Sequence, residues 1–179
     1  MTTWFTSDLH FSHTRLLELC PNTRGYETIE EMNAAIIKKW NEQVLPDDVV
    51  YILGDVFFCK ADTAIEILEQ LNGVKHLILG NHDKVIRDNV VIQGYFDSIN
   101  EYKVIKLSGK KVVLFHFPIQ QWDCMHYGSY HLYGHLHGGG GGVTGRAMDV
   151  GLDARDDIGL WSWEEIDTLL EVKEIRKHH

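Results

Sequence analysis

Short apolar runs separated by polar turns predict alternating strands and helices in the first half of the chain. Runs rich in β-branched and aromatic residues predict strands at Thr2–Thr6, Val49–Leu53 and Lys75–Leu79. Apolar residues at helical spacing predict helices at Thr28–Val44 and Ala61–Leu71. Strands that alternate with helices in this way indicate an α/β core.

The second half of the chain changes to a pattern dominated by strands. A two-residue Ser-Gly turn joins the first two strands, so they are expected to form a β-hairpin. Near the end, Ser162 and Glu165 have the spacing of a capping box at the start of a helix. The predicted elements are Tyr102–Leu107, Lys110–Phe115, Ser129–Tyr133, Gly145–Val150 and the helix Trp163–Leu170.

Composition and charge narrow the class of protein. The chain has 44% hydrophobic and 24% charged residues and no obvious linker, so we expect one domain over residues 1–177, with His178 and His179 as a tag remnant. The apolar runs fall far short of the ~20 residues that cross a bilayer, and the start lacks the features of a secretion signal. Three widely spaced cysteines argue against disulfides and favour the cytoplasm. A net charge of −9 argues against binding of long duplex nucleic acid.

Polar clusters follow the ends of the predicted strands. Most of the eleven histidines lie in short clusters beside Asp, Asn or Gly. Ligands collect at the carboxyl ends of strands in open α/β sheets. Five strand ends are therefore expected to bring carboxylate, amide and imidazole groups to one edge. These groups are Asp8, His10, Asp55, Asn81, His116, His135 and His137.

The spacing and the types of these side chains predict a metal site. In an extended D-x-H or H-x-H unit, residues i and i+2 point the same way, so Asp8 and His10 are expected to hold one ion together. His135 and His137 are paired similarly, with room to face two adjacent ions. Glycines precede three of the candidate ligands and permit close approach of the backbone. Oxygen and nitrogen ligands without thiolate suit manganese, iron, zinc, nickel or cobalt and disfavour calcium or copper(I).

Five motifs in this order resemble those of the calcineurin-like metallophosphoesterases. They are DxH, GD, GNHD, a lone His and GHLH, and they extend from Asp8 to about Asp153. The segments SDLHFSH, VYILGD and HFP, with an Arg-x-Tyr before a helix that ends in WN, look like a small bacterial or phage-type single-domain branch. The resemblance implies a four-layer αββα sandwich of two mixed β-sheets flanked by helices, the metallo-dependent phosphatase fold.

The resemblance also implies a role for each motif residue. Two divalent ions are expected, manganese first among the metals named above, with Asp55 bridging them and a hydroxide between them as the nucleophile. His82 resembles the general acid that protonates the leaving oxygen, and Asp83 would orient the His82 imidazole. By position, one ion would be held by Asp8, His10, Asp55 and His137, and the other by Asp55, Asn81, His116 and His135.

Residues outside the motifs have a structural alternative in each case. His13, Arg24 and Arg146 either contact the substrate or serve the fold or the solvated surface. Asp149 or Asp153 either supports a ligand or has no role at the site. Trp122 and Tyr127 either pack in the core or stack on a nucleobase. Packing or loop roles are expected for His76, His126, His131, Cys59 and the run Gly138–Gly142.

The expected activity is hydrolysis of phosphate esters, because all seven ligand positions and His82 are present. The chain has no room for a cap domain, so the cleft is expected to be shallow and open. Such a cleft favours a small or nucleotide-like phosphodiester over a bulky phosphoprotein. The alternatives are a phosphomonoesterase, a non-catalytic metal-binding or scaffold protein of the same fold, and a metal-dependent amide hydrolase. The sequence favours no particular oligomeric state.

Overall fold

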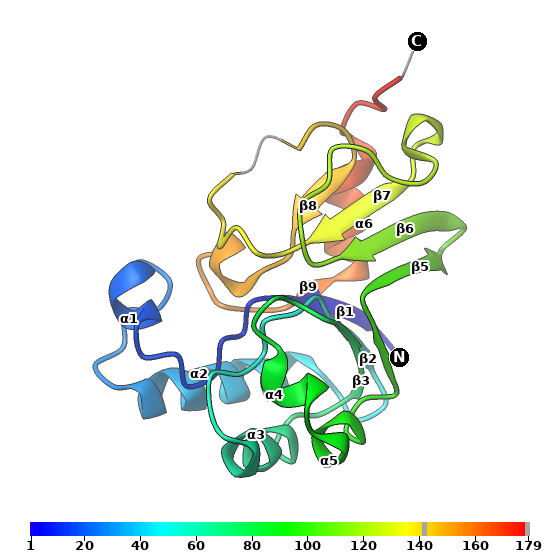
Figure 1. Ribbon diagram of the computed structural model, residues 1–179. Coiled ribbons are helices and arrows are strands. Elements are labelled where there is room, and N and C mark those ends of the chain that lie inside the picture. Colours follow the sequence, from blue (N-terminus) through cyan, green and yellow to red (C-terminus); the bar gives the residue numbers. More distant parts are fainter. Residues whose placement is uncertain (141–142, 178–179) are drawn as a thin grey trace.

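Two mixed β-sheets pack face to face in the computed structural model, which describes residues 1–140 and 143–177 (Figure 1). Part of the predicted glycine loop, Gly141 and Gly142, and the predicted tag remnant lie outside the described residues. The first half holds β1 (Thr3–Thr6), α1 (Leu16–Leu19), α2 (Ile29–Gln43), β2 (Val49–Ile52), α3 (Ala61–Leu68), β3 (Val74–Ile78), α4 (Lys84–Arg87), α5 (Val90–Gln93) and β4 (Ser98–Asn100). The second half holds β5 (Tyr102–Leu107), β6 (Lys110–Phe115), the 3₁₀ helix η1 (Met125–Tyr127), β7 (Tyr130–Tyr133), β8 (Ala147–Asp149), the 3₁₀ helix η2 (Leu152–Ala154), β9 (Trp161–Ser162) and α6 (Trp163–Glu171).

The strand order shows that both sheets are mixed. The first sheet has the order β4-β3-β2-β1-β9, in which β1 to β4 are parallel and β9 is antiparallel to β1. The second has the order β5-β6-β7-β8, in which the β5–β6 hairpin is antiparallel and the remaining pairs are parallel. Figure 1 shows α2 to α5 gathered on the side of the first sheet away from the second sheet. The predicted fold class, two mixed sheets flanked by helices, is confirmed.

The predicted elements are present with small shifts at their ends. Both hairpin strands begin and end at the predicted residues. The capping box of α6 is formed, because Ser162 accepts from the Glu165 N–H and the Glu165 carboxylate accepts from the Ser162 N–H at 2.8 Å. Two strands, β4 and β9, have three and two residues, too few to show an alternating pattern in the sequence. Among the described residues, no helix has the length and hydrophobicity needed to cross a bilayer.

Strand residues of the first sheet alternate between two cores. Phe5 of β1 faces the second sheet, where it belongs to one cluster with Leu114 and Leu132. Ile52 of β2 faces the helices and belongs to a cluster with Trp40 of α2. The buried Trp40 indole donates its N–H to the Asn72 carbonyl at 2.9 Å, so its one polar atom is satisfied. Packing on both faces fixes the strands and the positions of the loops that follow them.

These strands end just before the candidate ligands. The parallel strands β1, β2 and β3 finish shortly before Asp8, Asp55 and Asn81. From the second sheet, β6 and β7 finish just before His116 and Gly134-His135. Each sheet therefore contributes some of the polar groups at one rim, and neither sheet carries the whole set.

One histidine outside that rim makes the stability of the fold depend on pH. His131 of β7 is fully buried, its Nε2 accepts the Ile119 N–H at 3.3 Å, and its Nδ1 lies 3.3 Å from the Val113 carbonyl. Burial lowers the pKa of His131 from 6.5 to about 4. The unfolded chain therefore binds a proton on His131 between these pH values while the folded chain does not, so stability falls as pH decreases through that window. Because of His131, the free energy of unfolding is expected to fall by about 3 kcal/mol between pH 6.5 and pH 4.

Urea unfolding of the chelator-treated protein at pH 7 and pH 5 measures this effect. His131→Asn is expected to show a shallower loss of unfolding free energy than the unmodified protein. His126→Asn, at an exposed histidine in η1, is the matched control and should retain the full slope. Parallel pH dependences for the protein and His131→Asn would exclude this role of His131.

Candidate metal centre

The loops that carry the candidate ligands have a strained backbone. Five of the seven predicted ligands have positive φ angles, a conformation that costs most L-residues about 1–2 kcal/mol and that clusters at functional sites. The prediction that D-x-H and H-x-H are extended units is therefore wrong: each residue of these pairs is left-handed, and the side chains converge through the turn of the loop. The five residues are Asp8 (55°), His10 (48°), Asp55 (56°), His135 (73°) and His137 (48°).

Backbone and side-chain hydrogen bonds hold these loops together. The Asp8 N–H donates to the Gly54 carbonyl and the His10 N–H to the Asp55 carbonyl, both at 3.0 Å. Glycines are needed where the loops meet. A Cβ on Gly54 would lie 2.5 Å from the backbone nitrogen of Gly80 and 2.7 Å from Nδ1 of His116. The predicted close approach at the glycines is thus present, and any side chain there would push the ligand loops apart.

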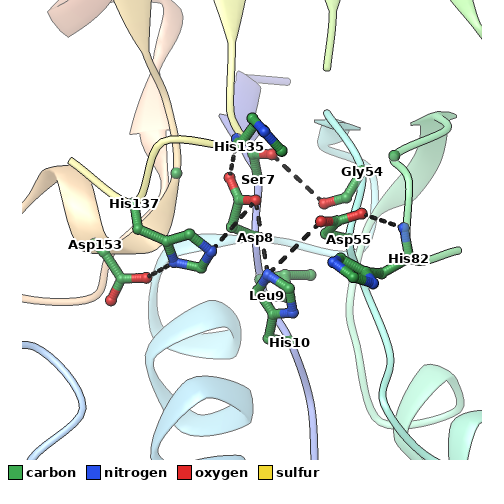
Figure 2. A network of polar contacts seen from close by, with 12 residues as sticks. Ser7, Asp8, Leu9, His10, Gly54, Asp55, His82, His135, His137 and Asp153 are labelled. Atoms are coloured by element: carbon green, nitrogen blue, oxygen red, sulfur yellow. Dashed lines mark hydrogen bonds and ion pairs between the residues drawn. The ribbon is translucent and has the colours of Figure 1, made fainter. Parts of the chain in front are cut away.

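The first group of ligand atoms comes from Asp8, His10 and His137, which point toward one another in Figure 2. Oδ1 of Asp8 lies 3.8 Å from Nε2 of His10 and 3.9 Å from Nε2 of His137. These separations are too long for hydrogen bonds. Oδ1 of Asp8 and both ring nitrogens of His10 are buried without a hydrogen-bond partner. Buried polar atoms are almost always paired, so this group has the arrangement expected around a cation.

The second group comes from Asp55, His116 and His135. Nε2 of His116 lies 3.5 Å from Oδ2 of Asp55 and 3.1 Å from Oδ1 of Asn81. Nδ1 of His116 lies 2.6 Å from the Leu53 carbonyl, to which it donates, leaving Nε2 to face the group. Burial opposes the charged form of His116, but the Asp55 carboxylate outweighs it and raises the pKa of His116. A positive charge is therefore favoured beside Asp55.

Asp55 lies between the two groups. Its Oδ2 atom is 3.8 Å from Nε2 of His10 and 3.5 Å from Nε2 of His116, while its Oδ1 accepts the backbone N–H of His82 at 2.8 Å. Burial raises the pKa of Asp55, but its bond with His116 and the other neighbours outweigh burial and lower it. Asp55 is thus an anion that faces both groups, the position expected of a bridging ligand.

Of the two roles left open for Arg24, contact with the substrate or service to the fold, its contacts match the second. Its guanidinium is fully buried and pairs with Asp153, with Nε 2.8 Å from Oδ1. Asp153 in turn accepts from Nδ1 of His137 at 2.7 Å. Burial disfavours the anion of Asp153, but the bonds from His137 and Arg24 outweigh it and lower its pKa. The predicted alternative for Asp153, support of a ligand, is the one the contacts match. Cys20 lies close to His137 and Asp153, but the positive charge of Arg24 opposes the binding of a cation among these three residues.

The contacts of Asp83 differ from the one expected for it, and those of Arg146 match its structural alternative. Asp83 is fully buried and does not touch the His82 imidazole in the described structure. It accepts backbone N–H groups of Asp55 (3.0 Å), Val56 (2.8 Å) and Gly80 (2.7 Å), so it fixes the Asp55 loop to the GNHD loop. Arg146 lies away from the ligand groups and donates to the carbonyls of Glu171 and Lys173 at the end of α6. Arg146 therefore stabilises the C-terminal helix.

A cluster of aromatic rings, formed by His82, Phe58 and His13, lies beside the ligands. His82 is exposed, and its ring centre is 5.9 Å from that of His10 and 4.8 Å from that of Phe58. His13 stacks on Phe58 with ring centres 3.8 Å apart. Burial, and then the neighbouring His10 and His82, lower the pKa of His13 to about 4. The sequence reasoning missed Phe58, for which the only signal is its place three residues after Asp55 in GDVFF.

Known proteins resemble this chain in sequence and in fold. A family model described as calcineurin-like phosphoesterase matches residues 1–139. The uncharacterized protein MJ1445 of Methanocaldococcus jannaschii is 35% identical over 136 residues, which are 75% of this chain and 68% of that protein. The Gene 66 protein of Mycobacterium phage L5 is 32% identical, with 87% of this chain and 91% of that protein covered. Among solved structures, a protein of unknown function from Aquifex aeolicus, AQ665, superposes with a TM-score of 0.73 and 26% identity over 94% of this chain and 98% of that one.

Proposed function

The chain belongs to the calcineurin-like phosphoesterase family and is a metal-dependent phosphoester hydrolase, and we propose that it cleaves small or nucleotide-like phosphodiesters at a centre for two divalent ions. The proposed ligands of the first ion are Asp8, His10, Asp55 and His137, and those of the second are Asp55, Asn81, His116 and His135. Both sheets contribute to this centre, which supports the view that residues 1–177 act as one domain.

The position of the Asp55 carboxylate is the main support for a centre with two ions. Oδ2 of Asp55 faces Nε2 of His10 on one side and Nε2 of His116 on the other, at distances too long for strong hydrogen bonds. Near it, Oδ1 of Asp8 and both ring nitrogens of His10 lack partners that a cation would supply. Their oxygen and nitrogen donors suit manganese, with iron, zinc, nickel and cobalt as the other candidates.

In the proposed mechanism the bound ions would neutralise charge on the phosphate and acidify a water molecule. The side chains of this chain hold and orient the reacting groups. His82 projects from the rim beside the ligands, and we assign it the transfer of a proton to the leaving oxygen. Its backbone N–H anchors it to Asp55 at 2.8 Å, so the proton donor and the centre are positioned by one carboxylate. Phe58 and His13 pack against this region and limit the directions that the His82 ring can take.

Space for a leaving group is present next to His82. A shallow cavity of about 450 Å³ is lined by His82, Phe58, Lys84 and Val85, among others. A second cavity of about 570 Å³ is lined by Asp153 and Gly138, among others, and by none of the seven proposed ligands. The open space beside His82 leaves room for the leaving group of either ester class, and the substrate panel below separates the two classes.

Metal removal tests the proposal. We expect EDTA treatment to reduce hydrolysis of bis(p-nitrophenyl) phosphate by at least about a hundredfold, because the ions supply several kcal/mol of charge stabilisation. Addition of Mn²⁺ should restore the rate, and calcium should not. A panel with p-nitrophenyl phosphate and a cyclic nucleotide compares the ester classes through kcat/KM. A higher kcat/KM for the monoester would replace the diesterase proposal with a monoesterase, and full activity in EDTA would reject the metal centre.

A further inference from the structure

Arg24 is connected to the first ligand group in three separate ways. It lies between α1 and α2, its side chain is fully buried, and each of its three guanidinium nitrogens is used. Nη1 donates to the Leu9 carbonyl at 3.0 Å, Nη2 donates to the Asp8 carbonyl at 2.6 Å, and Nε donates to Asp153 at 2.8 Å. A buried cation with every nitrogen hydrogen-bonded is a structural component of its surroundings, and its burial keeps it from the substrate.

The contact with Asp153 leads to a ligand. The Asp153 carboxylate takes two bonds from Arg24, through Nε and through Nη2 at 3.0 Å. Its Oδ2 atom also lies 2.7 Å from Nδ1 of His137. An ionised carboxylate accepts, so Nδ1 of His137 carries the proton and Nε2 is left unprotonated. That Nε2 faces Oδ1 of Asp8 at 3.9 Å, as a metal-binding nitrogen would.

The other two contacts lead to the loop that carries the remaining ligands of the first group. Asp8 and His10 both have left-handed backbones, which are held against their intrinsic cost only if the surroundings fix them. The carbonyls of Asp8 and Leu9, within this loop, accept from Arg24. None of the contacts of Arg24 given by the described structure reaches Asn81, His116 or His135.

We propose that Arg24 is a positioning residue for one ion of the pair: it sets the ring orientation and tautomer of His137 through Asp153 and holds the Asp8–His10 loop through two carbonyls. This inference rests on the proposed two-ion centre. It requires the planar fork of arginine, because Nε and Nη2 reach one carboxylate while Nη1 and Nη2 reach two carbonyls. A lysine has one nitrogen and could satisfy only part of this set.

Calorimetric titration of the chelator-treated protein with Mn²⁺ tests the inference. In Arg24→Lys we expect the affinity for one of two ions to fall about 10–100-fold, the usual effect of losing a partner behind a metal ligand. The affinity for the other ion should stay close to that of the unmodified protein. Asp153→Asn, which keeps the shape of the side chain and removes its charge, should weaken the same ion. Arg155→Lys is the matched control, because it disturbs an Arg–Asp pair (Arg155–Asp157, 2.8 Å) in the same segment as Asp153.

A second set of variants separates positioning from a general loss of structure. In a His137→Ala background, Arg24→Lys should cost less metal affinity than it does alone, because part of its effect passes through His137. Unfolding temperatures measured in EDTA report damage to the fold independently of the ions. Unchanged binding in Arg24→Lys, equal weakening of both ions, or fully additive effects with His137→Ala would each overturn the inference. If the unmodified protein bound no Mn²⁺, the proposed function itself would fail, which is a distinct result.

Discussion

Asp55→Ala is expected to lose both metal ions together and to reduce kcat/KM on phosphodiesters by more than about a thousandfold. Among the described residues, Asp55 is the carboxylate with one oxygen facing an imidazole of each ligand group, 3.8 Å from His10 and 3.5 Å from His116. Its removal takes an anionic ligand from each ion at once. In the proposed assignment every other ligand belongs to one ion, so Asp55 should have the largest effect. Calorimetry for Mn²⁺ stoichiometry and steady-state kinetics on the same preparation measure both consequences.

The left-handed backbone of Asp55 requires a companion variant. Alanine is strained at a φ of 56°, whereas asparagine tolerates that region well. Asp55→Asn therefore keeps the backbone and an acceptor for the His82 N–H while it removes the charge. We expect it to weaken both ions while the unfolding temperature in EDTA changes little. Asp47→Ala, at an exposed aspartate, is the control for loss of one negative charge. An Asp55→Ala protein that still bound two equivalents of Mn²⁺ would contradict the bridging assignment.

The sequence was sufficient for the longer elements and for the expectation that the candidate ligands share one edge, because both depend on local pattern. Alternation and helical spacing mark β1, β2, β3 and α2, and the polar residues after each strand must share the edge where parallel strands end. The capping box of α6 is likewise a local signal that the structure bears out. Short elements such as β9 depend on a neighbour, β1, that lies far away in the chain.

The parts that the sequence could not predict depend on contacts between distant segments. Arg24 and Asp153 are 129 residues apart, and neither sits in a motif that pairs them. Asp83 is adjacent to His82 in the chain, yet its carboxylate turns away to three backbone N–H groups of two loops. The resemblance therefore implied a partner for the His82 imidazole that the fold does not provide. The left-handed turns at Asp8 and His10 also follow from the loops around them, since neither residue type requires that conformation.

The contacts of Asp83 and Arg24 have one physical cause. The buried carboxylates of Asp8 and Asp55 repel each other until cations bind, so the surrounding protein must hold their loops in place. Asp83 does this by tying two ligand loops to each other, and Arg24 by tying another loop to Asp153. Both side chains are fully buried and hydrogen-bonded. The two charged groups assigned by sequence to catalysis and substrate binding instead maintain the geometry of the ligands.

His82→Ala is expected to retain both ions and lose most turnover. The residue contributes only a backbone N–H to Asp55, and alanine keeps that group, so the ligand positions should not change. Loss of the imidazole removes the proposed proton donor, and general acids contribute about 10²–10⁴-fold to rate. The loss should fall mainly on kcat and should depend on the substrate. An alkyl or nucleoside leaving group needs a proton as its bond to phosphorus breaks, whereas p-nitrophenolate leaves readily without one.

The measurement is therefore a comparison of two diesters, one with a p-nitrophenyl leaving group and one with an alkyl leaving group, in the protein and in His82→Ala. The ratio of the two rates should change by about a hundredfold or more in the variant. Mn²⁺ stoichiometry should remain that of the unmodified protein, and His126→Ala, at an exposed histidine in η1, should match the protein in every assay. Equal losses on both diesters would indicate that His82 binds the phosphate and does not protonate the leaving oxygen. Unchanged activity on the alkyl diester would remove His82 from the mechanism, and the proton would then have to come from a different group on the rim.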